Sequence, residues 1–383
     1  LSPTTKVQSM TEAWIIDACR TPRGIGKPGR GALTEIHPQR LGATVLRALA
    51  ERNNLKTEDV ADIIWGCNAQ RGQNSNDMGR MSALDAGYDV TVVDQWPAHV
   101  EAMKENGLHI QMTDLDLKIP VKALHVCELA SAKLEFDLIF LAVKSFDTKW
   151  MAELMAPYLK DDGVLVGLQN SMNEMEITCD IIGRERVVGC CIELSGELFT
   201  PGFVQRNTPR GGTWFAVGEL DGSITPRVEE IQKILSNVAT VEISTNILGT
   251  KWTKLIVNSM VMGPWGLLGL LNREAMKLPG IFDLAVEIGK ETVAVGTAIG
   301  LNVEPVFGLK EDDFSGDEAK MLLNALTTMT GHTGPRARTA PIHDHLKGRK
   351  NEIEFINGLV SRKGQEAGVP TPYNDVLREL ASE

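Results

Sequence analysis

Cysteine is scarce in this sequence and carries no recognisable pattern. The 383 residues include six cysteines, none of which forms a CxxC pair, and Cys190 and Cys191 are adjacent. This spacing excludes the common zinc motifs and predicts no disulfide framework, which is typical of a protein kept in a reducing compartment. No secretory signal is recognisable near residue 1 either, so we expect a cytoplasmic protein without a metal site.

Long apolar runs and excess positive charge are also missing. The longest apolar stretch, 255–271, is interrupted by Asn258, Ser259 and Pro264, which predicts a buried helix rather than a membrane span. The formal net charge is −11. Nucleic-acid phosphates are bound by clustered Lys and Arg, so this balance argues against nucleic acid as a partner. The expected partner is therefore a small molecule, with neither a membrane nor nucleic acid involved.

Strand and helix patterns alternate through the middle of the chain. This alternation predicts a mostly parallel sheet covered by helices. The expected strands are 90–93, 137–143, 163–168 and 187–192, and the expected helices are 148–159 and one beginning at Pro226. Before residue 90 the patterns predict strands at 14–19 and 62–67 and helices at 39–52 and 78–86.

Strand patterns stop at about residue 245, and only helical patterns continue. They cover 248–271, 279–299 and 350–367. The expected fold class is therefore α/β, with a Rossmann-like, mostly parallel sheet domain followed by an all-helical C-terminal domain.

One glycine motif stands in the wrong place for a dinucleotide site. Residues 24–29, GIGKPG, match GxGxxG. In a dinucleotide site this motif lies directly between a strand and a helix, because the backbone N–H groups at the helix N-terminus bind the phosphates. Here four residues separate it from the predicted strand 14–19, and the next predicted helix begins about ten residues later. A surface loop is the favoured interpretation, and phosphate binding is the alternative.

Three stretches near the N-terminus have a common resemblance. They are EAWIIDACRTP at 12–22, DIIWGC at 62–67 and GRMSALDAG at 79–87. They resemble the N-terminal part of the thiolases, the acetyl-CoA acyltransferases, over residues 10 to about 88. The resemblance ends before that family's nucleophilic cysteine, and Cys67 is better explained as a buried structural residue. Thiolase activity is therefore not expected.

Five further motifs follow in order after residue 86. They are GYDVTVVD at 87–94, LAVK at 141–144, QNSM at 169–172, KLIVN at 254–258 and NEIEFING at 351–358. This set resembles the ketopantoate reductases (2-dehydropantoate 2-reductases) over residues 87 to about 380. The resemblance implies an NAD(P)H-dependent oxidoreductase that reduces ketopantoate to pantoate, in pantothenate biosynthesis, or acts on another small 2-oxo acid. It implies NADPH as cofactor and is compatible with a homodimer.

The same resemblance assigns roles to particular residues. Lys254 would protonate the developing alkoxide, and Glu352 would hydrogen-bond the substrate and orient the site. Lys254 and Asn258 stand at i and i+4, on one helical face that continues into apolar residues, which favours function over a solvated lysine. The implied substrate-binding residues are Asn170, Asn258, Asn272 and Thr339, and the implied cofactor-binding residues are Gly66, Asp94, Lys144 and Asn170.

Three positions modify what the resemblance implies. Met262 stands where the family often has another substrate-binding asparagine, and Ala340, preceded by Thr339, stands where it has a serine. Both changes favour a wider class of 2-oxo acid or related ketone over ketopantoate alone. Asp94 ends the expected second strand, where an acid pairs with a ribose diol and disfavours a 2′-phosphate. NADH is therefore the alternative to NADPH.

The two resemblances meet at Ala86-Gly87-Tyr88-Asp89. The expected domains are a thiolase-like extension at 1–58, a Rossmann-like dinucleotide-binding domain at 59–245 and a helical substrate and catalytic domain at 246–383. Strand 62–67 and helix 78–86 would replace the first βα unit, but no GxGxxG follows Gly66. We predict that the fold is kept and cofactor affinity falls. The alternative is a non-catalytic recombined chimera that folds but binds cofactor poorly.

Overall fold

The computed structural model describes residues 38–56, 90–112, 115–209, 212–304, 318–331 and 337–382. The chain divides into two units, one of Leu1–Val92 with Ile119–Ala123 and one of Val93–Lys118 with Leu124–Glu383. In the first unit, helix α1 (Pro38–Asn53) confirms the helix predicted at 39–52. The strands predicted at 14–19 and 62–67 and the helix predicted at 78–86 lie outside the described residues, as do residues 24–29.

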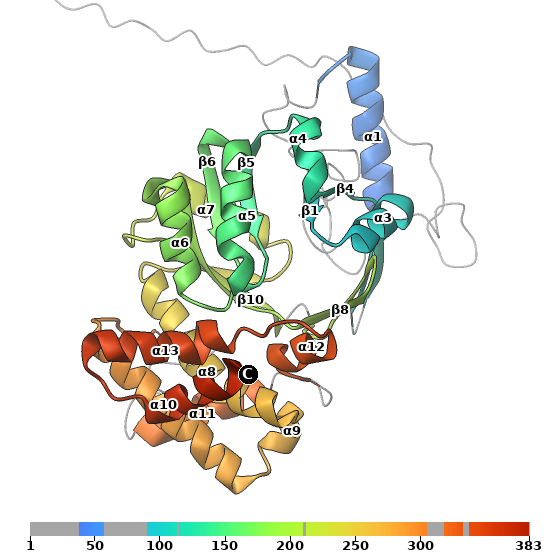
Figure 1. The fold of residues 1–383 in the computed structure, drawn as a ribbon. Coiled ribbons are helices and arrows are strands. Elements are labelled where there is room, and N and C mark those ends of the chain that lie inside the picture. The colour runs from blue at the N-terminus through green and yellow to red at the C-terminus, as the bar shows by residue number, and fades with distance from the viewer. Residues whose placement is uncertain are drawn as a thin grey trace, which may run out of the picture. The chain divides into compact units, whose positions relative to one another are not determined.

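A five-stranded sheet organises the first half of the larger unit, with the order β11-β10-β7-β6-β5. Three of its strands, β5, β6 and β10, are labelled in Figure 1. All neighbouring strands are parallel except β7 and β10, which are antiparallel. The mostly parallel sheet predicted from the alternating pattern is thus confirmed. The strands are β5 (Phe136–Leu141), β6 (Leu159–Gly167), β7 (Val187–Glu193), β10 (Trp214–Glu219) and β11 (Thr240–Ile243).

Helices cover both faces of this sheet. In β6, Leu165 packs in a core with residues of α5 (Thr148–Met155), whereas Val164 and Val166 pack in a core with residues of α7 (Pro226–Leu235). Successive side chains of a strand point to opposite faces, so a strand covered on both faces is apolar throughout. This explains why the central strands read as continuous apolar runs in the sequence.

One helix is shorter than predicted. The pattern at 148–159 predicts a single helix, but α5 ends at Met155 and a 3-10 turn follows over Ala156–Tyr158. Pro157 lies in that turn, and proline has no N–H with which to continue an α-helix. The chain then enters β6 at Leu159, four residues earlier than the pattern predicted.

Two smaller sheets accompany the main one. β1 (Thr91–Asp94) confirms the strand predicted at 90–93 and pairs with β4 (Lys122–His125). A second sheet has the order β3-β2-β9-β8. Its strands are β2 (Leu108–Gln111), β3 (Asp116–Ile119), β8 (Gly196–Thr200) and β9 (Phe203–Arg206), with α3 (Pro97–Asn106) preceding them.

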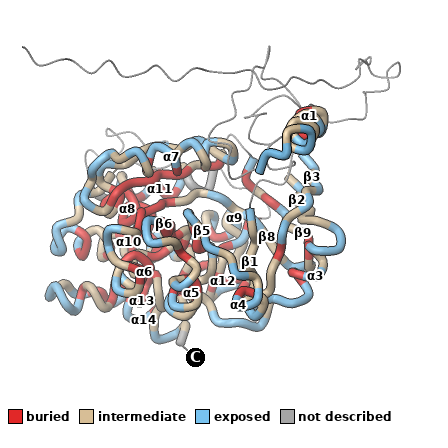
Figure 2. Tube along the Cα trace, turned by 90° about the horizontal axis from the view of Figure 1, so that it is seen from above, coloured by how far each residue is buried: buried red, intermediate tan, exposed pale blue. Residues whose placement is uncertain are grey.

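From Ile247 onward the described residues form helices and their connections, as the sequence predicts. The central helix α8 is buried along most of its length (Figure 2). Trp252, Leu255 and Met260 of this helix belong to the largest core. The helices are α8 (Ile247–Leu268), α9 (Asn272–Ala275), α10 (Pro279–Ala298), α11 (Glu318–Gly331), α12 (Ala340–Leu346), α13 (Ile353–Ala367) and α14 (Pro372–Ser382). None of the helices in the described ranges has the length and apolar character that crossing a membrane requires.

Candidate functional site

Polar side chains follow β5 and β6 where these two strands end. Lys144 and Ser145 come after β5, and Gln169 and Asn170 come after β6. β5 and β6 are parallel neighbours, so both sets of residues lie at the same edge of the sheet. In open α/β sheets, ligands bind outside the carboxyl ends of the strands. This edge is therefore the expected place for a ligand site.

A buried ionic cluster joins this edge to the helical half. Lys144 Nζ lies 2.7 Å from Glu352 Oε2 and 2.9 Å from Asp344 Oδ2. Glu352 Oε1 accepts hydrogen bonds from the backbone N–H of Ser145 at 2.9 Å and from its hydroxyl at 2.8 Å. Asp344 Oδ1 in turn accepts from Arg349 Nε at 2.8 Å. The predicted residues Lys144 and Glu352 are thus in direct contact.

Three members of this cluster, Ser145, Asp344 and Arg349, were not predicted from the sequence. Asp344 is fully buried and Ser145 is 2% exposed. Ser145 could have been considered because it directly follows Lys144 at a strand end. Asp344 gives no comparable signal, since its partner Lys144 lies 200 residues away.

Lys254 and Asn258 lie on one face of α8, as their spacing predicted, and both are buried. Lys254 is 6% exposed, and its Nζ lies 3.8 Å from Glu193 Oε2 at the end of β7. A buried lysine of this kind is an unusual residue for a helix core, because burying an ammonium is costly unless charges or polar groups compensate. Its position favours a chemical role for Lys254.

Three of the predicted substrate-binding residues contain buried polar atoms without a hydrogen-bond partner among the described residues. These atoms are Asn258 Nδ2, Asn272 Oδ1 and Thr339 Oγ1. Thr339 is the N-cap of α12, yet its hydroxyl does not cap the helix, although capping is the usual role of threonine there. A partnerless buried polar atom costs about 1–3 kcal/mol. A bound molecule with a carboxylate or ketone oxygen to accept from Asn258 Nδ2 and a hydroxyl group to donate to Asn272 Oδ1 would satisfy these atoms.

The segment that carries Thr339 runs beside α8 and α9. The Asn272 N–H donates to the carbonyl oxygen of Ala337 at 3.1 Å. A Cβ atom at Gly266 would lie 3.7 Å from Thr339 Oγ1, which places this hydroxyl against α8. Asn272 and Thr339 are therefore brought to the same end of the helical half.

Of the residues implied to bind a cofactor, three are described. Lys144 and Asn170 lie at the sheet edge, and Asp94 ends β1, where its Oδ1 accepts from the Trp96 N–H at 2.7 Å. A half-buried carboxylate after a strand and polar groups at the carboxyl ends of parallel strands fit the ribose and amide groups of a dinucleotide. Gly66 lies outside the described residues.

A second buried ion pair was not predicted from the sequence. Lys251 Nζ is paired with the Glu174 carboxylate, and the two residues are 4% and 1% exposed. Burial is the largest single influence on the pKa of Lys251 and lowers it, but the Glu174 carboxylate together with the thiols of Cys191 and Cys190 outweighs burial, so the pKa is raised. Lys251 precedes Asn258 by two helical turns, so it shares the face that Lys254 and Asn258 define, and this spacing was an available signal.

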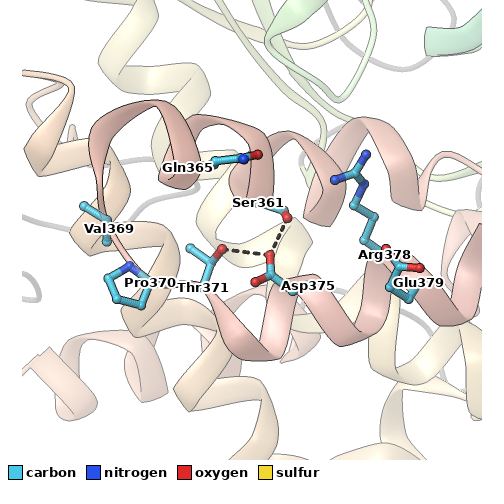
Figure 3. Close-up of a pocket in the computed structure, with 8 residues that line it drawn as sticks. All are labelled: Ser361, Gln365, Val369, Pro370, Thr371, Asp375, Arg378 and Glu379. Carbon is cyan, nitrogen blue, oxygen red and sulfur yellow. Dashed lines mark hydrogen bonds between the residues drawn. The ribbon is translucent and has the colours of Figure 1, made fainter.

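A pocket of about 470 Å³ lies elsewhere, between α13 and α14 (Figure 3). The Ser361 hydroxyl donates to the Asp375 carboxylate, and the Thr371 hydroxyl donates to it at 3.0 Å. These polar groups are already satisfied and hold the two helices together. We therefore assign this pocket a structural role.

Within the ranges that the structure describes, no group of three or more His, Cys, Asp or Glu side chains is arranged to hold a metal ion.

The fold and the buried polar site define a Rossmann-like α/β protein with a helical C-terminal half. Residues 78–220 match the model of the ketopantoate reductase PanE/ApbA family, and residues 246–383 match its C-terminal model. Over these residues the chain belongs to the ketopantoate reductase family. Residues 13–96 match the model of the thiolase N-terminal domain, which overlaps the first reductase match. Both resemblances inferred from the sequence are thus confirmed.

Curated relatives agree with the family. The 2-dehydropantoate 2-reductase of Archaeoglobus fulgidus is 26% identical over 301 residues, which cover 77% of this chain and 89% of the relative. The one from Pyrococcus horikoshii is 26% identical over 299 residues, with the same coverage of 77% and 89%.

Solved structures share the fold. The PanE/ApbA family ketopantoate reductase from Ralstonia eutropha JMP134 is 24% identical, with a TM-score of 0.65 over 77% of this chain and 90% of that one. D-mandelate dehydrogenase with NADH and anilino(oxo)acetate is 21% identical, with a TM-score of 0.66 over 79% of this chain and 94% of that one.

Proposed function

We propose that this chain is a nicotinamide-dependent reductase that converts a 2-oxo acid to the 2-hydroxy acid, in the manner of a 2-dehydropantoate 2-reductase. The observation that carries the proposal is the buried Lys254 one helical turn from Asn258, whose buried Nδ2 has no hydrogen-bond partner among the described residues. Such a pair offers a proton donor and a neutral hydrogen-bond donor to the same small molecule. Membership of the ketopantoate reductase family supports the reaction class.

A reduced nicotinamide, when bound, would supply hydride to the carbonyl carbon of the substrate. Lys254 donates a proton to the carbonyl oxygen and stabilises the negative charge that develops there. Asn258, Asn272 and Thr339 hold the carboxylate and hydroxyl ends of the substrate through their buried polar atoms. Asn170 lies at the sheet edge, where it would contact both the carbonyl and the nicotinamide.

Cofactor binding is assigned to the sheet edge. Lys144, Asn170 and Asp94 would hold the cofactor, and Glu352 would hold Lys144 in place. The family resemblance also implies Gly66, which lies outside the described residues. NADPH is the cofactor expected of the family, and Asp94 favours NADH. We further propose that affinity for either cofactor is lowered because the sequence after Gly66 has no GxGxxG. The domain limits 1–58, 59–245 and 246–383 are part of this proposal.

Turnover of defined substrates tests the function. The purified chain is mixed with NADPH or NADH and with ketopantoate, phenylglyoxylate or 2-oxoisovalerate, and loss of the reduced nicotinamide absorbance is followed. We expect turnover of at least one 2-oxo acid. Lys254→Ala should lower kcat by about 10²–10⁴-fold, the usual contribution of a general acid, and leave cofactor binding unchanged. Unchanged turnover in this variant would show that Lys254 is not the proton donor.

The match to a thiolase N-terminus favours a second candidate, a recombined chimera without catalysis. The two candidates differ in cofactor binding. Fluorescence titration should detect NADPH or NADH bound to an active reductase, and no binding at millimolar concentrations would favour the chimera.

A ketopantoate reductase from Staphylococcus aureus is described as dimeric. We propose a homodimer for this chain too, which light scattering on the purified protein would test.

A further inference from the structure

Lys251 is the most completely engaged charged side chain at the candidate site. It lies on α8, one turn before Lys254, and its Nζ approaches the carbonyl oxygens of Gln169 at 3.2 Å and Cys190 at 2.9 Å. Its Nζ also forms an ion pair with the Glu174 carboxylate. An ammonium group has three N–H donors, and these two carbonyl oxygens and one carboxylate match them in number. Lys251 is thereby fixed in one position and has no donor left for a substrate.

Glu174 contacts the turn of residues 169–171, which also contains the Gln169 carbonyl bound by Lys251. It stands in the first turn of α6 (Asn173–Ile182), where the positive end of the helix dipole favours a carboxylate. Its Oε2 lies 3.0 Å from the Ser171 hydroxyl, whose single proton is shared between this oxygen and Asn173 Oδ1 at 2.6 Å, while its other oxygen faces Lys251. The turn of residues 169–171 is therefore held at both ends, by Lys251 through Gln169 and by Glu174 through Ser171. Asn170 lies between these two anchors.

Lys251 also connects three secondary-structure elements. Gln169 follows β6, Cys190 is within β7, and Lys251 belongs to α8. A shift of α8 relative to the sheet would move the Gln169 carbonyl and with it the Asn170 side chain. Since Lys254 is on the same helix, Lys251 couples the position of the proton donor to the position of Asn170.

We propose that Lys251 and Glu174 are positioning residues, which set the orientation of Asn170 toward the reacting carbonyl while Lys254 supplies the proton. This inference rests on the proposed reductase function. A small misplacement of a reacting group can cost about 10²-fold in rate, so the pair is expected to act on kcat rather than on substrate affinity.

Three variants separate positioning from stability. Lys251→Met leaves a buried carboxylate unpaired, and Glu174→Gln leaves a buried ammonium unpaired, so each should lower the melting temperature. The double variant Lys251→Met/Glu174→Gln removes both charges and should melt closer to the original protein. We expect kcat to fall about 10- to 100-fold in Lys251→Met, with little change in KM, and to stay low in the double variant.

The control is Arg227→Met. Arg227 of α7 pairs with the buried Glu219 of β10 at 2.6 Å, and its hydrogen bonds go to Glu219 and Glu185 rather than to residues 169–171. It should lower the melting temperature and leave kcat unchanged. A double variant with the original kcat would overturn the proposal, because it would show that the pair contributes stability alone.

Hydrogen–deuterium exchange at residues 169–172 provides a readout that does not depend on turnover. Lys251→Met should accelerate exchange in this segment, whereas Arg227→Met should not. If the original protein reduces no 2-oxo acid, the proposed function fails, and the exchange experiment still decides the positioning of the turn. Unchanged exchange in Lys251→Met would overturn the inference in either case.

Discussion

The side chains of Lys144 and Glu352 meet at 2.7 Å although 208 residues separate them in the sequence. Lys144 follows a strand of the sheet, and Glu352 precedes helix α13 of the helical half. Asp344 of α12 is a second carboxylate partner of Lys144. The contact therefore sets how the helical half meets the edge of the sheet at which we propose the cofactor and substrate bind.

Glu352→Gln should weaken this contact while keeping the side chain's shape. The variant removes a charge-assisted hydrogen bond to Lys144 or Ser145, and hydrogen bonds to charged groups contribute about 1.5–3 kcal/mol. We expect the free energy of unfolding in urea to fall by about 2 kcal/mol, and kcat/KM for 2-oxo acid reduction to fall by at least about tenfold. Glu354→Gln is the matched control, because Glu354 is 43% exposed and pairs with Arg362 and Arg378. Equal effects of the two substitutions would contradict a special role for Glu352.

Asn258→Leu should separate binding from stability. The Asn258 Nδ2 group is buried without a hydrogen-bond partner in the part of the chain that the structure describes, and removing such a group relieves about 1–3 kcal/mol of desolvation cost. The free energy of unfolding should stay level or rise, while KM for the 2-oxo acid increases. Asn357→Leu provides the comparison, since Asn357 Nδ2 donates to Ser259 O at 3.1 Å and to Asn374 Oδ1 at 2.9 Å. Loss of stability in Asn258→Leu as large as in Asn357→Leu would argue that Asn258 is structural.

Asp94→Asn should shift the choice of cofactor. A carboxylate at this place accepts from a ribose diol and repels a 2′-phosphate. We expect the Kd for NADH to rise about tenfold, equivalent to about 1.4 kcal/mol, and the Kd for NADPH to stay level or fall. Fluorescence titration of both cofactors measures the change. Parallel losses of both affinities would show instead that the Trp96 turn, which Asp94 also holds, is what matters.

The free energy of unfolding should fall at alkaline pH because the Cys190 thiol is buried. Burial raises the pKa of the Cys190 thiol from its ordinary 9.0 to about 12. Between these pH values the unfolded chain loses this proton and the folded chain keeps it, so the unfolding free energy falls by up to about 1.4 kcal/mol per pH unit. Urea unfolding at pH 8 and at pH 10 should show a smaller loss in Cys190→Ala than in the unsubstituted chain. Cys127→Ala, which removes an exposed thiol, is the control and should keep the loss.

Several features could be predicted because they depend on local spacing. Alternating apolar runs predicted the sheet, and the i, i+4 spacing placed Lys254 and Asn258 on one face of α8. The error at 148–159 was local too, since Pro157 marks the end of α5. Resemblance supplied the proposed roles of single residues such as Thr339, and the structure adds that its hydroxyl does not cap α12.

The sequence by itself determined the class of fold, the helical second half and the order of the family motifs, because backbone geometry repeats every two residues in a strand and every 3.6 in a helix. Only the tertiary structure decided which charges meet. Lys144 with Asp344 and Glu352, and Lys251 with Gln169, Glu174 and Cys190, are brought together across 61 to 208 residues. No spacing rule predicts such pairs, since they depend on how helix ends pack against the edge of the sheet.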